Sequence, residues 1–265
     1  MSELKLKIHN NKFQVLAASI PGTDTSLVYT APYAEGDFIL LETDEDCKFC
    51  VTQMEDTMPP ALVYTPGGRM AFHVPAPEQR SNYSPKSFAG NCHLIRARVA
   101  KPEEISARRN LAFNPYDAGR ETGCYPHTTT NVDTQDVSFA ARNAVDGIFE
   151  NNSHGGWPYQ AWGINKDPNA TLKVDFGRRV TIDELRLTLR ADFPHDSWWT
   201  SATVQFSDGT QEVLTLERTG KPQSFPIAPR TIEWLELQEL KKAKDISEFP
   251  ALTQLEVFGT ESEIL

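Results

Sequence analysis

The sequence has little cysteine, no excess of positive charge and no long apolar run. Its 265 residues include 4 cysteines, and 36 acidic side chains outnumber 26 basic ones to give a net charge of −10. Binding to nucleic-acid phosphates or to anionic membrane surfaces needs a basic face, which this balance disfavours. No apolar run is long enough to span a bilayer, and residues 1–7 lack the apolar core of a secretory signal. We therefore expect no nucleic-acid partner, no membrane partner and a cytoplasmic location.

The sequence also lacks the short motifs of common enzyme classes. The nucleophile elbow, the phosphate loop, the dinucleotide fingerprint and the His-Glu-x-x-His zinc motif are all absent. An acid–base pair could still form between Asp192 and Asp196, or between either of them and His154 or His195. A glycosidase needs two carboxyls roughly 5–9.5 Å apart, a distance that sequence spacing does not provide. A hydrolase acting on a sugar therefore stays open as an alternative.

The four cysteines fit reduced thiols better than a disulfide framework. They are Cys47, Cys50, Cys92 and Cys124. The Cys-x-x-Cys pair at residues 47–50 could form half of a zinc site, completed by Cys92 with His93 or by Cys124 with His127. Because that second half has no paired spacing, free thiols are the favoured interpretation.

The first part of the chain consists of short segments with the alternation of β-strands. Apolar residues alternate with polar ones, or form short buried runs, and a Pro-Gly-Gly turn at residues 66–68 separates two of the segments. These segments are residues 4–8, 13–17, 37–42, 61–65, 70–74 and 93–100. No helical period of useful length is present. We predict an all-β domain over residues 1–105, a sandwich or jelly roll, whose role is open.

A junction near residues 101–117 leads into a second predicted all-β domain, residues 106–265. Residues 102–109 can form one helical turn with acidic side chains at its N-terminal end. The junction is too apolar for a free linker, so we expect the two domains to be docked. Alternating positions predict the buried face of the second sandwich. These positions are Leu172, Val174, Leu185, Leu187, Val204, Phe206, Leu235, Leu255 and Val257.

Five short motifs follow one another in the second domain. They are the Asn-Ala-Val-Asp-Gly turn at residues 143–147, Trp162, the Asp-Phe-Gly strand end at 175–177, the Ser-Asp-Gly hairpin at 207–209 and the closing Glu-Val-Phe-Gly at 256–259. In the first motif, Asp-Gly indicates a turn because glycine adopts a positive φ without steric cost. The ordered series resembles the coagulation factor 5/8 type C, or discoidin, family of galactose-binding-like β-sandwiches. The resemblance covers roughly the C-terminal 130 residues.

This resemblance implies roles for several residues. The spacing of Trp162 matches the core tryptophan of the family, and Trp234 lies in an apolar strand, so we expect both to be buried. Some family members bind a structural calcium ion, and Asp146 and Glu256 match the motif positions for its ligands. Ile148 stands where the family pattern often continues with another Asp or Asn. Since calcium takes six to eight oxygen ligands, the missing donor leaves the calcium site open.

The strongest prediction of function comes from two loops rich in aromatic and polar residues, 150–162 and 190–200. Aromatic faces stack on the apolar C–H patch of a pyranose, while Asp, Arg and His side chains bind its hydroxyls. The candidate ligand-binding residues are His154, Trp157, Tyr159, Arg190, Asp192, His195, Asp196, Trp198 and Trp199. Trp198 or Trp199 could instead cap the core.

We predict that these residues cluster, partly exposed, at one end of a non-catalytic carbohydrate-binding sandwich. A protein-interaction module that uses the same loops on a protein surface is the other alternative, besides the hydrolase. The oligomeric state and the identity of the sugar stay open.

Overall fold

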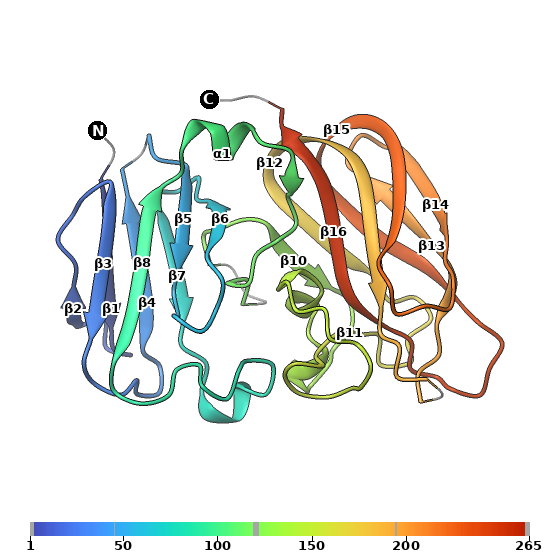
Figure 1. The fold of residues 1–265 in the computed structure, drawn as a ribbon, viewed down its shortest axis with the longest axis horizontal. Helices are drawn as coiled ribbons and strands as arrows, with labels where there is room; N and C mark the ends of the chain where they lie inside the picture. The colour runs from blue at the N-terminus through green and yellow to red at the C-terminus, as the bar shows by residue number, and fades with distance from the viewer. Residues whose placement is uncertain (1–2, 45, 119–121, 194, 263–265) are drawn as a thin grey trace.

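Strands and turns make up nearly the whole of the computed structural model, which describes residues 3–44, 46–118, 122–193 and 195–262 (Figure 1). The described residues contain one short α-helix, α1 (Pro102–Ser106), and three 3₁₀ turns, η1 (Pro77–Gln79), η2 (Val137–Phe139) and η3 (Ala141–Val145). No helix in these ranges is both long and apolar enough to cross a membrane. The all-β fold class and the single helical turn after Lys101 were both predicted correctly.

The N-terminal part is a sandwich of two four-stranded antiparallel sheets. One sheet has the order β2 (Val15–Ala18), β1 (Leu4–His9), β4 (Phe38–Thr43) and β7 (Arg69–His73). The other has the order β3 (Asp24–Tyr29), β8 (His93–Val99), β5 (Phe49–Gln53) and β6 (Ala61–Tyr64). Burial alternates strictly along β1, where Leu4, Leu6 and Ile8 face the core, as the two-residue period of a strand requires.

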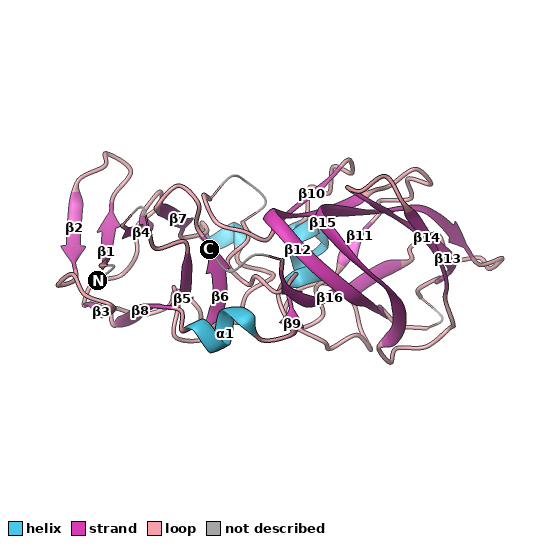
Figure 2. Ribbon diagram, turned by 90° about the horizontal axis from the view of Figure 1, so that it is seen from above, coloured by secondary structure: helices cyan, strands magenta, loops and turns pink. Residues whose placement is uncertain are grey.

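The C-terminal part is one eight-stranded antiparallel sheet that curls around a second hydrophobic cluster (Figure 2). Its main path is β11 (Trp162–Gly163), β16 (Ala251–Glu261), β12 (Leu172–Leu189), β15 (Gln223–Lys242), β13 (Trp199–Phe206) and β14 (Gln211–Thr215). In addition, β10 (His127–Thr130) pairs with β12, and β9 (Arg109–Asn110) pairs with β16. The pairing of β12 with β15 shifts register between Asp175 and Val180, and such irregularities bend long strands.

The predicted buried face of the second sheet is confirmed. All nine predicted positions have 0% exposed side chains, and so does Trp162. The burial predicted for Trp234 is wrong. Leu235 and Leu237 occupy the inner face of β15, so the side chain of Trp234 points outward and is half-buried beneath the Lys173 Nζ, 4.6 Å from its ring centroid.

The chain crosses between the two hydrophobic clusters after α1. Leu111 and Ala112 are buried in the second cluster, whereas Tyr116 and Cys124 are buried in the first. A division of the chain at residue 105 therefore stays a prediction, because segments beyond that residue contribute to the first core.

The two sandwiches are in direct contact along this crossing. The Asn82 Nδ2 donates to the Asn143 Oδ1 over 2.8 Å, and the hydroxyls of Ser81 and Ser138 lie 3.0 Å apart. At the opposite end of the contact, the guanidinium of Arg178 on β12 lies 5.2 Å from the ring centroid of Phe49 and 5.0 Å from that of Tyr64. Figure 1 shows the resulting side-by-side arrangement, with α1 bridging its upper edge.

The turn at residues 143–147 is held by a buried hydrogen-bond network. The Gln254 Nε2 of β16 donates to the Asn143 carbonyl over 2.7 Å and to the Asp146 Oδ1 over 2.8 Å, while the Gln254 Oε1 accepts from the Gly147 amide. The Gln160 Nε2 donates to the Asp146 Oδ2 over 2.8 Å. Gly147 has φ +82°, and a Cβ there would lie 2.6 Å from the Phe113 ring. The turn therefore requires glycine and is fixed to the last strand.

Burial raises the pKa of Asp146 to about 6, although Arg142 and the surrounding hydrogen-bond donors act to lower it. The carboxyl of an unfolded chain has a pKa of about 3.9. Between about pH 4 and pH 6, the folded protein therefore binds more protons at this group than the unfolded chain does. It follows that the free energy of unfolding falls as the pH rises through this window and levels off above it.

This dependence predicts the behaviour of an Asp146→Asn variant. At about 1.4 kcal/mol per pKa unit, the stability of the wild type should fall by about 2 kcal/mol relative to the variant between pH 4 and pH 7. Denaturant unfolding of both proteins at four pH values measures the difference. Glu150→Gln, at an exposed position nearby, is the control and should follow the wild type. A difference between wild type and Asp146→Asn that does not change with pH would contradict the assignment.

Candidate functional site

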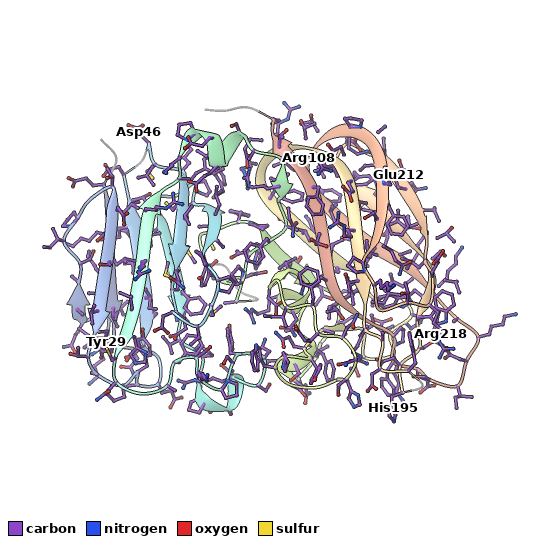
Figure 3. The ribbon with its side chains drawn as sticks, in the orientation of Figure 1. Tyr29, Asp46, Arg108, His195, Glu212 and Arg218 are labelled. Atoms are coloured by element: carbon purple, nitrogen blue, oxygen red, sulfur yellow. The ribbon has the colours of Figure 1, made fainter. Side chains whose placement is uncertain are left out.

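A cavity of about 860 Å³ opens at one end of the C-terminal sandwich. Figure 3 labels His195 at this end and Arg108 at the opposite end of the same sandwich. The cavity walls are segments 133–136, 163–165 and 249–251, together with Phe139, His154, Arg190, His195 and Asp196. The connections that follow β10 and β11 and those that precede β13 and β16 therefore meet here.

A buried ion pair lies in one wall of the cavity. Arg190 and Asp196 are 5% and 3% exposed. The Arg190 Nε donates to the two Asp196 oxygens over 2.9 and 2.8 Å, and its Nη2 donates to the Asp196 Oδ1 and to the Phe249 carbonyl. The Asp196 Oδ2 also accepts from the Asp192 amide over 3.0 Å. These bonds fasten the 190–196 loop to the segment before β16.

One nitrogen of the Arg190 guanidinium makes no hydrogen bond. This atom, Nη1, is buried and has no hydrogen-bond partner within the described part of the chain. The guanidinium carbon lies 5.6 Å from the ring centroid of Phe139, so the cation is also next to an aromatic face. A buried donor without a partner costs free energy unless an acceptor reaches it, which makes it suited to a ligand oxygen.

Two histidines share the carboxylate of Asp192 at the mouth of the cavity. The His154 Nδ1 lies 2.5 Å from the Asp192 Oδ2, and the His195 Nδ1 lies 3.4 Å from the Asp192 Oδ1. The two imidazole rings are 5.9 Å apart, and their side chains are 51% and 71% exposed. The hydrogen bond with His154 is the main cause that lowers the pKa of Asp192. The group is a polar, accessible set of donors and acceptors.

The structure brings together five of the nine predicted site residues and separates the other four. His154, Arg190, His195 and Asp196 line the cavity, and Asp192 joins them through its hydrogen bonds. Their role in binding stays a prediction. The expected grouping of these residues at one end of the sandwich agrees with where the cavity lies.

The predicted tryptophans are elsewhere. The exposure expected for Trp199 is wrong, because its side chain is 0% exposed and its ring centroid lies 6.2 Å from that of the core residue Trp162. Trp198 is half-buried and packs against the same hydrophobic cluster. Trp199 is the first residue of β13, where strand pairing places its side chain over the core, and Trp198 immediately precedes that strand. The burial of Trp199 agrees with the alternative that one of these residues caps the core.

Trp157 and Tyr159 are not among the residues that line the cavity. Trp157 is 41% exposed, but its amide donates to the Ser81 carbonyl of the first sandwich over 2.6 Å. Its side chain borders a small crevice of about 40 Å³ between the two sandwiches, beside Asn82 and Gln160. The Tyr159 amide donates to the Gly156 carbonyl in a tight turn. The 150–162 loop is thus divided, with His154 at the cavity and Trp157 at the domain contact.

Sequence reasoning missed most of the cavity wall, including two phenylalanines and two aspartates. Phe249 is 48% exposed, and Phe139 lies beside Arg190. Asp133 and Asp136 are exposed on the segment that follows β10. An exposed Phe-Pro step immediately before the last strand was the available signal for Phe249. Nothing local marks the two aspartates, since they become part of a site only when the segment meets β16 and the 190–196 loop.

The two residues predicted to bind calcium, Asp146 and Glu256, have other partners in the structure, and the calcium site stays a prediction. Both carboxylate oxygens of Asp146 accept hydrogen bonds from N–H groups, and the Gln254 amide nitrogen lies within 2.8 Å of the Asn143 carbonyl and the Asp146 Oδ1. A protein nitrogen thus occupies the position between these oxygens. Glu256 lies instead 3.8 Å from the Arg186 Nη1. In the described ranges, no three His, Cys, Asp or Glu side chains are placed to hold a metal.

The zinc alternative is not supported either. The Cys47 and Cys50 sulfurs lie 3.9 Å apart inside the first sandwich, Cys124 is buried beside Asn114 and Thr122, and Cys92 is exposed. Cys92 is therefore accessible to solvent, whereas the other three cysteines are buried. The four thiols are free, as the favoured interpretation of the sequence had it.

No family model matches the sequence, and no curated protein matches it. Several solved structures are similar in fold. They include chitosan-binding module 1 of a chitosanase/glucanase from Paenibacillus sp. IK-5 (18% identity, TM-score 0.40, 57% of this chain and 98% of the module). They also include the family 32 CBM from C. perfringens NanJ in complex with galactose (16%, 0.38, 49% and 91%) and a Streptococcus pneumoniae fucose binding module, SpX-3 (13%, 0.42, 57% and 98%). At these identities and TM-scores the likeness does not decide what this chain binds.

Proposed function

We propose that this chain binds a carbohydrate in the cavity at the end of its C-terminal sandwich. The observation that carries the proposal is the combination of an exposed aromatic ring, that of Phe249, with hydrogen-bonding side chains from separate segments around one cavity of about 860 Å³. This volume falls within the roughly 300–1,000 Å³ of typical small-molecule sites.

Each wall of the cavity offers a type of contact that a sugar needs. Phe249, with Ile164 and Pro250 beside it, presents apolar surface for the C–H face of a pyranose. The imidazoles of His154 and His195 can donate to or accept from hydroxyls, and the Arg190 Nη1 can donate. These groups come from several connections and are held in place by the Arg190–Asp196 pair. The site is therefore preorganised for a small polar ring with an apolar face.

The sugar-acting hydrolase is the second candidate, favoured by the hydrogen-bonded His154–Asp192–His195 group. Asp196 does not serve as the second catalytic carboxyl, because both its oxygens accept from the Arg190 guanidinium. Incubation of the protein with each sugar that binds, followed by chromatography of the products, separates the two candidates. Unchanged sugar supports binding alone, and cleaved sugar supports the hydrolase.

Phe249→Ala tests the proposed binding site. Loss of a stacking aromatic ring costs about 1–3 kcal/mol, as for bases stacked on aromatic side chains, which is roughly a 5- to 150-fold weaker affinity. Titration calorimetry against a panel of mono- and oligosaccharides measures the change. Phe149→Ala is the matched control, because Phe149 is similarly exposed, at 41%, and does not line the cavity. Equal affinities of the two variants for a sugar that binds the wild type would contradict the proposal.

Asp196→Ala should act through stability rather than through direct contact. It leaves the Arg190 guanidinium buried without its counter-ion, a change that typically costs about 3–5 kcal/mol. Thermal and denaturant unfolding should show this loss, whereas Phe249→Ala should unfold like the wild type. If Asp196→Ala retained the full stability of the wild type, the pair would not be the element that holds the 190–196 loop.

A further inference from the structure

The charges on the cavity wall are unbalanced. Arg190 and Asp196 neutralise each other as a buried pair. Asp133 and Asp136 lie on the facing segment, and no ion pair involves either of them within the described residues. Among the described residues, the carboxylates of these two aspartates accept one hydrogen bond, from the Ser138 amide to the Asp136 Oδ1. The cavity wall therefore includes two carboxylates that no cation of the described residues compensates.

The neighbouring cations do not restore the balance. Lys166 lies with its Nζ 4.8 Å from the ring centroid of Phe249, but the same Nζ is paired with Glu248 over 2.7 Å. The two histidines of the wall share the carboxylate of Asp192, a further negative charge. A ligand that carries its own positive charge is favoured in such surroundings, and an acidic ligand is repelled.

We propose that the cavity selects sugars that carry a protonated amine, that is, amino sugars with a free amino group. This inference rests on the proposed function and adds the class of ligand. The ammonium group would donate to the carboxylates of Asp133 and Asp136, and the sugar ring would lie against Phe249. A ring hydroxyl would accept from the buried Arg190 Nη1, the donor left without a partner in this wall.

The acidic segment alone would not define a site, but it is only one side of a built cavity. Arg190 is 5% exposed, lines the same cavity and retains an unused donor. An ammonium group needs acceptors and a sugar hydroxyl needs a donor, so one ligand satisfies both walls. A uronic acid would satisfy the Arg190 donor but would place a third carboxylate beside Asp133 and Asp136.

Titration calorimetry of the full chain with three oligosaccharides of equal length tests the selection. The ligands are an oligomer of glucosamine, the same oligomer N-acetylated, and an oligomer of galacturonic acid, at a pH where the amine is protonated. Contacts between exposed charges each contribute about 2- to 5-fold in affinity, so the two carboxylates should favour the free amine by roughly 4- to 25-fold. High salt should reduce this preference, because it screens exposed charges.

The double variant Asp133→Asn, Asp136→Asn should lose the preference, because its affinity for the glucosamine oligomer should fall to that for the N-acetylated one. The matched control is Glu217→Gln, Glu233→Gln, which removes two exposed negative charges from the same sandwich outside the cavity wall and should keep the preference. Butylamine, an amine without a sugar ring, is a further arm and should bind far more weakly than the glucosamine oligomer.

The outcomes distinguish this inference from the function on which it rests. If the N-acetylated or acidic oligomer binds as tightly as the free amine, the ligand class is overturned while carbohydrate binding stands. If butylamine binds as tightly as the oligomer, or if the control variant loses the preference as well, the selection does not come from this cavity. If no sugar binds, the proposed function itself fails.

Discussion

The hydrogen bonds between Gln254 and the turn at residues 143–147 connect the main parts of the molecule. Through them the last strand of the second sandwich holds the Asn143 carbonyl and the Asp146 carboxyl. The side chain of Asn143 in turn receives a hydrogen bond from Asn82 of the first sandwich. All these groups are buried, where an unmet hydrogen bond is costly, so the strand, the turn and the domain contact stabilise one another. The turn at residues 143–147 is therefore one of the places where the two sandwiches are in contact.

The candidate site depends on this arrangement without sharing its residues. The network uses Gln254 near the start of β16, and the cavity uses Phe249, Pro250 and Ala251 immediately before it. The Arg190–Asp196 pair has a similar role on the cavity side. It holds the 190–196 loop against the Phe249 carbonyl, just before the start of β16. Rigid support of this kind allows exposed groups such as Phe249 and His195 to be presented to a ligand at little cost in ordering.

The electrostatics of the cavity follow from which charges are paired. The positive charge of Arg190 in the wall is paired with Asp196, while Asp133 and Asp136 pair with no cation in the described part of the chain. The acidic character of the whole chain, with a net charge of −10, therefore continues into the site. The aromatic ring, the buried donor without a partner and the two carboxylates of this cavity are the features on which the proposed selection of amino sugars rests.

The sequence by itself determined the fold class and the buried face of the second sheet, because alternation and turn chemistry are local and repeat along a strand. It also indicated the 190–196 loop, since such a concentration of polar and aromatic residues in a connection is unusual for a plain turn. Only the tertiary structure decided where each aromatic side chain lies and whether it is exposed. Trp199 begins a strand and is buried over the core, Trp157 is held at the domain contact, and Phe249 is exposed in the cavity. Whether a side chain in a connection lies in the cavity wall, in the core or at the domain contact depends on which distant segments the fold brings together. Residues 139 and 249, for example, are more than 100 residues apart in the sequence and line the same cavity, and no local pattern encodes that proximity.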